Sequence, residues 1–297
     1  MVSIVPLIAG VELGGTKCIA TLGTGPGDVR AQQTIPTTDP ETTLAAIEAV
    51  LDGWRFDAIG VASFGPLQLD TGAPDYGAIT VTTKPGWSGT DLVRGLDRRY
   101  GRPIGFQTDV NGAALAEGRW GAALGLSTHA YITIGTGVGV GLVAGGRPVQ
   151  GVAHGEAGHM RVPRAPGDSY AGWCRFHGDC VEGLISGPAL AERFGRPGRE
   201  LAEDRPEWDL FVHDLGGLLH NLVTLAAPER IAIGGGVIAA REHLLPRLRA
   251  RLAESLGGYG SLAGYAEELD ARLGPPGLGA MAGPLGALAV GLEVVGG

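Results

Sequence analysis

The sequence predicts an α/β protein of two domains around a central cleft, built by duplication of a mixed β-sheet unit. Residues 6–23 and 130–146 each consist of a strand-like apolar run, a glycine-rich turn and a second apolar run. The first stretch is followed by a helix-like segment over 40–53 and an apolar strand over 58–63. Strands and helices therefore alternate, and the repeated pattern favours a duplicated sheet.

The rest of the chain continues this alternation. A polar start and an Ala/Leu-rich body predict a helix that begins near Asn111. Residues 208–227 form a long helical pattern, and residues 229–252 are typical of a strand, a glycine turn and a helix.

The apolar C-terminal tail sets the expected domain boundaries. It predicts a last helix, 280–297, that packs back on the first domain. We therefore expect a small N-terminal α/β domain over 1–118 together with that helix, and a larger C-terminal α/β domain over 119–279.

Composition excludes several classes of protein. The chain has 297 residues, 44% of them hydrophobic and 18% charged, which is typical of a globular protein with a sizeable core. A net charge of −8 argues against a nucleic-acid surface. We expect no membrane span, because no apolar run reaches about eighteen residues. The start lacks a basic region typical of a signal peptide, and only three cysteines occur, so a reducing cytoplasm is expected.

Three glycine-rich turns could bind a nucleotide through backbone N–H groups. Alone, the first turn favours a plain hairpin, because it matches neither a P-loop nor a Rossmann motif. The second turn, at 135–141 in the duplicated stretch, favours instead two hairpins that bind a polyphosphate from both sides. The third turn, at 233–236, could contact a nucleotide base or ribose. The nucleotide-binding residues predicted from these turns are Gly14, Gly15, Thr16, Lys17, Gly135, Thr136, Gly137, Gly235 and Gly236.

A cysteine and histidine pattern indicates a metal site. Cys174, His177 and Cys180 are separated by two residues each in a chain that has only three cysteines. Zinc is bound by four tetrahedral ligands in structural sites, and this stretch supplies three of them. The nearby HGEAGH lacks the H-E-x-x-H spacing, and Gly155 and Gly158 argue against the helix that a zinc protease needs.

Eight short motifs together carry a resemblance to a known family. In chain order they are ELGGTK, FGP, TKPGW, TDVNGAA, ITIGTGVGVG, HGEAGH, CRFHGDCVEG and IGGGV. The sequence resembles the ROK family (repressor, open reading frame, kinase), and within it the ATP-dependent fructokinase-like branch, which has the C-x-x-H-x-x-C spacing. This resemblance implies the duplicated actin-like ATPase fold, related to ribonuclease H, of sugar kinases that close over a sugar and ATP.

The resemblance also implies roles for individual residues. Asp109 is the expected general base, although local sequence alone favours a helix cap equally. Zinc would be structural and closed by His159 as its fourth ligand, after Cys174, His177 and Cys180. Mg²⁺ would bind with ATP, and Glu12 stands where many family members have Asp. The sugar-binding residues implied are Gly65, Thr108, Asp109, Glu156, His159 and Glu182.

The sequence leaves the roles of four side chains open. Lys17 could touch a phosphate or lie on the strand edge. Lys84 and Trp87 could shape the mouth of the cleft, and ordinary packing explains Trp87 equally well. His154 could pack in a loop or face the sugar.

The expected reaction is transfer of the γ-phosphate of Mg·ATP to D-fructose, giving fructose 6-phosphate, in a homodimeric enzyme. Glucokinase, mannokinase, N-acylhexosamine kinase and polyphosphate-using forms are alternatives with the same motifs. A sugar-sensing repressor would carry a helix-turn-helix before the first glycine turn, and only nine residues precede Gly10. A binder without catalysis is disfavoured by the presence of Asp109.

Overall fold

The structure is a computed structural model that describes residues 5–239 and 241–295. Its contacts divide the chain into two compact units. The first comprises Met1–Gly125, Arg147–Gly155 and Ala280–Gly297, and the second comprises Leu126–Gly146 and Glu156–Gly279. Each unit has a separate apolar core.

The first unit contains a five-stranded mixed sheet in the order β3-β2-β1-β4-β5. β1 is antiparallel to β2 and parallel to β4, and β5 continues the parallel part of the sheet. β1 and β2 form the first predicted glycine hairpin. The strand bounds are β1 (Ile8–Leu13), β2 (Lys17–Gly25), β3 (Asp28–Pro36), β4 (Ala58–Ser63) and β5 (Ile104–Thr108).

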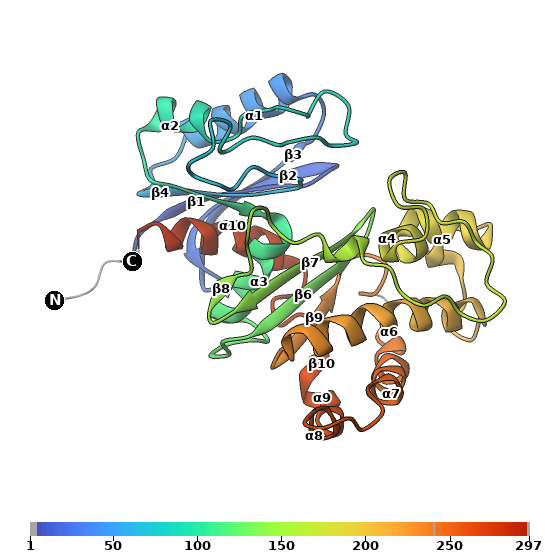
Figure 1. Ribbon diagram of the computed structural model, residues 1–297. Coiled ribbons are helices and arrows are strands. Elements are labelled where there is room, and N and C mark those ends of the chain that lie inside the picture. Colours follow the sequence, from blue (N-terminus) through green and yellow to red (C-terminus); the bar gives the residue numbers. More distant parts are fainter. Residues whose placement is uncertain (1–4, 240, 296–297) are drawn as a thin grey trace. The chain divides into compact units, whose positions relative to one another are not determined.

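Helices cover both faces of this sheet. Figure 1 shows α1 and α2 on one face and α10 on the other. Gly10, Gly60 and Gly105 lie side by side across three strands, and a Cβ on Gly60 would lie 1.9 Å from the Ala287 carbonyl oxygen of α10. This glycine row therefore lets the α10 backbone rest directly on the strands. The helices are α1 (Pro40–Asp52), α2 (Arg94–Tyr100), α3 (Asp109–Trp120) and α10 (Ala282–Glu293), preceded by the 3₁₀ turn η3 (Gly279–Met281).

The second sheet repeats the topology of the first. Its order is β10-β9-β6-β7-β8, in which β6 is antiparallel to β7 and parallel to β9. β6, β7 and β9 thus correspond to β1, β2 and β4, and this repetition confirms the duplicated α/β fold. The bounds are β6 (His129–Ile134), β7 (Val138–Ala144), β8 (Arg147–Pro148), β9 (Arg230–Gly234) and β10 (Leu273–Gly274).

The helices of the second unit pack around α6, whose Trp208 and Phe211 are fully buried. α6 contacts α7 and α4. Within the described residues, no helix combines the length and apolar character needed to cross a membrane. The bounds are η1 (Ala157–His159), α4 (Val181–Ile185), α5 (Gly187–Phe194), η2 (Gly198–Glu200), α6 (Glu207–Ala226), α7 (Leu244–Leu256), α8 (Leu262–Glu267) and α9 (Leu269–Arg272).

Two predicted helix starts differ from the structure. The helix expected near Asn111 begins at Asp109, because the Thr108 hydroxyl accepts the N–H of Asn111 at 3.2 Å and caps the helix earlier. Over 229–252 we predicted a strand, a glycine turn and a helix. The connection between β9, which ends at Gly234, and α7, which starts at Leu244, is longer than a glycine turn.

Candidate active site and metal centre

Three predicted site segments follow parallel strands at one edge of the first sheet. The register pairs Leu13 with Ser63 and Ser63 with Thr108, so β1, β4 and β5 end level with one another. The first glycine turn, Gly65 and Asp109 all come directly after these strand ends. Ligands of α/β proteins commonly bind at the carboxyl edge of parallel strands.

Asp109 is the first residue of α3 and is half-buried. Its Oδ1 accepts the N–H of Val110 at 2.8 Å. Before it, the Gln107 side-chain oxygen accepts both the Thr108 N–H and the Asn111 amide, at 2.8 and 3.0 Å. These bonds hold the entry to the helix, and the positive end of the helix dipole favours a negative charge at this position.

Glu12 is a second carboxyl group in the same unit. Burial, reinforced by the charge of Asp109, raises the pKa of Glu12 to about 7, and Lys17 acts in the opposite direction. Among the described residues, no hydrogen bond reaches its buried Oε2. Oxygen donors of this kind suit Mg²⁺. A cation would supply the partner that this carboxylate lacks, so Glu12 fits a role in holding Mg²⁺.

The raised pKa of Glu12 predicts a pH-dependent cost in stability. The folded protein keeps a proton on Glu12 that the unfolded chain releases above about pH 4.5. The free energy of unfolding should therefore decrease from pH 5 to pH 8, by roughly 1–3 kcal/mol from this group. Glu12→Gln should remove that decrease, as measured by urea unfolding without nucleotide or Mg²⁺. The exposed Glu267→Gln is the control, and equal pH slopes for Glu12→Gln and wild type would contradict the prediction.

Two lysines meet at the first glycine turn. The N–H of Gly14 donates to the Lys17 carbonyl at 3.0 Å and closes the turn. The Lys84 ammonium donates to the Gly15 carbonyl at 2.5 Å, from a loop far along the chain. The sequence contains only these two lysines, against 21 arginines. The Lys84 ammonium is therefore placed at a turn predicted to bind phosphate, and Lys17 is the residue that ends this turn.

Two side chains with open interpretations have packing roles. Trp87 is fully buried, its Nε1 donates to the Thr38 carbonyl at 2.8 Å, and its ring lies edge-on to Phe64. Trp87 therefore anchors the loop that carries Lys84. His154 is buried and its Nε2 accepts the N–H of Leu67 at 2.9 Å, which fixes the chain just after Gly65.

In the second unit, Glu182 supports the second glycine turn. Its Oε2 accepts the N–H of Val138 at 3.1 Å, directly after Gly137. From the same side, the N–H of Gly187 donates to the Gly135 carbonyl at 2.7 Å. We did not predict this contact from the sequence, because the family resemblance implied a sugar-binding role for Glu182. The turn 135–137 is thus held by residues of α4 and α5.

The third glycine turn packs against the strand before the second one. Gly235 has φ +89°, and a Cβ there would lie 2.4 Å from backbone atoms of Ile134. Only glycine fits this position. Gly236 has open space at its Cβ position, so a ligand could approach the backbone there.

The structure brings the four predicted metal ligands together. One donor atom each from His159, Cys174, His177 and Cys180 lies within 4.8 Å of all the others. His159 Nδ1 is 3.4 Å from the Cys180 sulfur and 3.7 Å from the Cys174 sulfur, and His177 Nδ1 is 3.7 Å from the Cys174 sulfur. In tetrahedral zinc sites a nitrogen and a sulfur ligand lie about 3.5 Å apart, given Zn–N and Zn–S bonds of about 2.0 and 2.3 Å. The cluster fits zinc.

The metal cluster is continuous with the predicted sugar-binding loop. His159 ends the 3₁₀ turn η1, and its N–H donates to the Glu156 carbonyl at 2.9 Å. The next residue, Met160, accepts the N–H of Val181 at 2.9 Å. A metal held by His159 therefore fixes the backbone on which Glu156 stands.

A chain of ion pairs, which the sequence did not predict, ties the metal loop to the core. Asp179, between two metal ligands, pairs with Arg164 at 3.2 Å, and Arg164 pairs with Asp168 at 2.5 Å. Arg193 joins Asp168 at 2.5 Å to the fully buried Asp214 of α6 at 2.8 Å. Arg164 and Asp168 are only four residues apart, but Arg193 lies 25 residues from Asp168 and 21 from Asp214, so no local pattern marks the chain as a whole.

The two sheets of equal topology, each with a glycine hairpin, define a protein of the actin-like ATPase fold. The chain belongs to the ROK family, whose family model matches residues 8–293. It is 38% identical to a fructokinase of Pediococcus pentosaceus, over 95% of this chain and 96% of the relative. It is 39% identical to a fructokinase of Zymomonas mobilis, over 95% of each chain. A crystal structure of a ROK hexokinase from Thermus thermophilus superposes with a TM-score of 0.77 at 32% identity, covering 98% of this chain and 100% of the other.

Proposed function

We propose that the protein is an ATP-dependent sugar kinase that phosphorylates D-fructose at O6. The fructokinases among its relatives support this substrate. The observation that carries the proposal is the position of Asp109, a carboxylate at the first residue of α3, level with the first glycine turn at one edge of the sheet.

In this proposal Asp109 accepts the proton of the attacking sugar hydroxyl. Phosphoryl transfer depends mostly on positioning and charge stabilisation, so a base held by its helix needs no unusual basicity. Gly65, Thr108, Glu156, His159 and Glu182 bind the sugar. Carboxylates suit this task because their oxygens accept hydrogen bonds from neighbouring hydroxyls.

The glycine turns bind the nucleotide. Backbone N–H groups at Gly14–Lys17 and at 135–137 hold the phosphates, and Lys17 and Lys84 offset their charge. Gly235 and Gly236 meet the nucleoside. Mg²⁺, held by Glu12 together with the phosphates, would neutralise the charge that develops during transfer.

Zinc has a structural role in this proposal. Four protein ligands close a tetrahedral site and leave no position for a catalytic water. The metal therefore acts on the reaction only by fixing His159 and Glu156 for the sugar.

The proposal predicts a clear order of substrates. Coupled assays of ADP release should show a higher kcat/KM for fructose than for mannose, glucose or N-acetylhexosamines, with ATP preferred over polyphosphate as the donor. Hydrogen bonds to hydroxyls that differ between these sugars provide the selectivity. Faster turnover of glucose than fructose would make it a glucokinase of the same family, and no turnover of any sugar would contradict the kinase assignment.

A further inference from the structure

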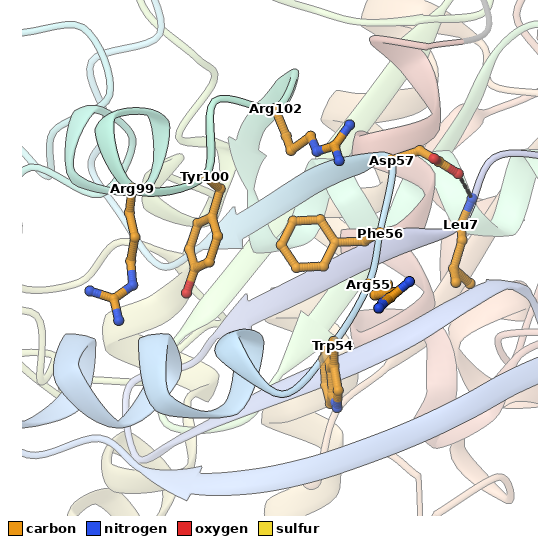
Figure 2. Close-up of a pocket in the computed structure, with 8 residues that line it drawn as sticks. All are labelled: Leu7, Trp54, Arg55, Phe56, Asp57, Arg99, Tyr100 and Arg102. Carbon is orange, nitrogen blue, oxygen red and sulfur yellow. Dashed lines mark hydrogen bonds between the residues drawn. The ribbon is translucent and has the colours of Figure 1, made fainter.

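A cavity lies at the edge of the first sheet opposite to the edge that carries Asp109. It has a volume of about 560 Å³, within the range of small-molecule sites. Its lining comes from the residues that precede β1, β4 and β5 and from the end of α2, as Figure 2 shows. Asp109 follows the other end of β5, so this cavity is separated from the proposed base by the length of that strand, roughly 16 Å at about 3.3 Å per residue.

Aromatic side chains form its wall. The Phe56 ring is buried and meets the Tyr100 ring edge-on, with centroids 5.5 Å apart. The Tyr100 hydroxyl donates to the Glu48 carbonyl and to Asp52, at 3.1 and 3.0 Å. Trp54 is half-buried beside them. The wall is therefore fixed before any ligand binds, and its ring faces suit a planar or sugar ring.

Three arginines line the cavity, and they differ in their partners. Arg99 forms ion pairs with Asp52 and Glu48. For Arg55 and Arg102, no ion pair or hydrogen bond is found among the residues that the structure describes. In Figure 2, Arg102 lies above the Phe56 side chain and Arg55 lies below it. The one lining carboxylate, Asp57, accepts the N–H of Leu7 at 2.8 Å.

Besides the paired Arg99, the lining therefore holds two guanidinium groups against the single carboxylate of Asp57, in a protein whose net charge is −8. Planar guanidinium groups bind phosphate through paired hydrogen bonds, and two of them around an aromatic wall recognise a phosphate attached to a ring. Both side chains are exposed to water in the free protein, and a neutral sugar would offer these two cations no anionic partner. The chemistry of the cavity therefore selects a phosphate ester over its parent alcohol.

We propose that this cavity binds a small phosphate monoester, a sugar phosphate or nucleoside monophosphate, as an effector remote from the proposed reaction site. Arg55 and Arg102 hold the phosphate, and Trp54 contacts the ring. The proposal does not depend on the proposed kinase activity, because the site uses none of the residues assigned to it.

The test is a titration of the full-length protein that follows Trp54. Fructose 6-phosphate, AMP, inorganic phosphate and fructose are added separately while tryptophan fluorescence is recorded, with Trp54→Phe to identify the signal. We expect the fluorescence change that Trp54→Phe abolishes to be saturable with one of the two esters, weaker with inorganic phosphate and absent with fructose. Added salt should weaken binding.

Variants separate this site from phosphate binding elsewhere. The double variant Arg55→Gln/Arg102→Gln should bind the ester at least roughly tenfold more weakly, since each guanidinium supplies charge-assisted hydrogen bonds. Its melting temperature and basal turnover should stay unchanged. Arg98→Gln, an exposed arginine of α2 outside the cavity, should behave as wild type. Equal affinity of the double variant, or ester titrations that are identical in wild type and Trp54→Phe, would overturn the proposal.

Discussion

Asp109→Asn should lose nearly all sugar kinase activity, with kcat lower by roughly 10²–10⁴-fold, the usual contribution of a general base. The KM for fructose should change little, because an amide of the same size keeps an oxygen for hydrogen bonding. Its side chain can still accept the N–H of Val110, as Asp109 does, so the start of α3 should be preserved. Steady-state kinetics together with a fructose-binding titration measure both effects.

Asp39→Asn is the matched control for this variant. Asp39 also stands at the start of a helix, where it caps α1 by accepting the N–H of Thr42 at 2.9 Å. Its loss of charge should cost a small amount of helix stability, about 0.3–1 kcal/mol, and leave kcat unchanged. If Asp109→Asn kept more than about a tenth of wild-type kcat, Asp109 would only stabilise the start of α3, next to the Thr108 cap, and would not act as a base.

The predicted strands and helices are those with a strong local pattern. Both glycine hairpins, the strand 58–63 and the helices over 40–53 and 208–227 occur as predicted. The strand β3 was missed because its sequence, DVRAQQTIP, is almost entirely exposed at the edge of the sheet and has no apolar alternation. Helix α2 was missed because seven residues with one buried side chain give no helical period.

The residues of the candidate site could likewise be predicted only where a local sequence pattern marks them. The metal ligands could be predicted because three of them lie within seven residues, and the spacing itself indicates the chemistry. Trp87 could not be assigned from sequence, since a tryptophan in a loop rich in proline and glycine has no periodic neighbours. Its burial depends on Thr38 and Phe64, which only the folded chain brings near.

The ion pairs that link the loop of the metal cluster to α6 are the part of the structure that the sequence predicts least. Arg193 and Asp214 are nearly fully buried charges that stabilise each other only when both are present. In sequence, arginine and aspartate are ordinary surface residues. Their pairing joins α5 to α6 and cannot be inferred from either segment alone.

Cys180→Ser should remove the metal and weaken the second unit. Serine replaces a buried sulfur atom that lies 3.4 Å from His159 Nδ1, so the proposed four-ligand zinc site would lose a thiolate. Structural zinc contributes about 10–16 kcal/mol of apparent folding free energy in zinc-finger peptides, and a loss of several kcal/mol is expected here. Metal analysis and thermal melting measure both changes. Cys18→Ser, at the buried cysteine of the first unit, is the control and should retain the metal.

The kinetic consequence distinguishes a structural metal from a catalytic one. Metal-free protein that remains folded at low temperature should show a higher KM for fructose, by about 10–100-fold if Glu156 and His159 lose their support, while kcat changes less. His177→Cys should keep the metal and the wild-type KM, because three thiolates and one imidazole also form a tetrahedral zinc site. A metal-free protein with unchanged melting temperature and unchanged KM would show that the cluster does not support the sugar-binding loop. A loss of kcat alone, at constant KM, would instead place the metal in the chemical step and contradict a closed four-ligand site.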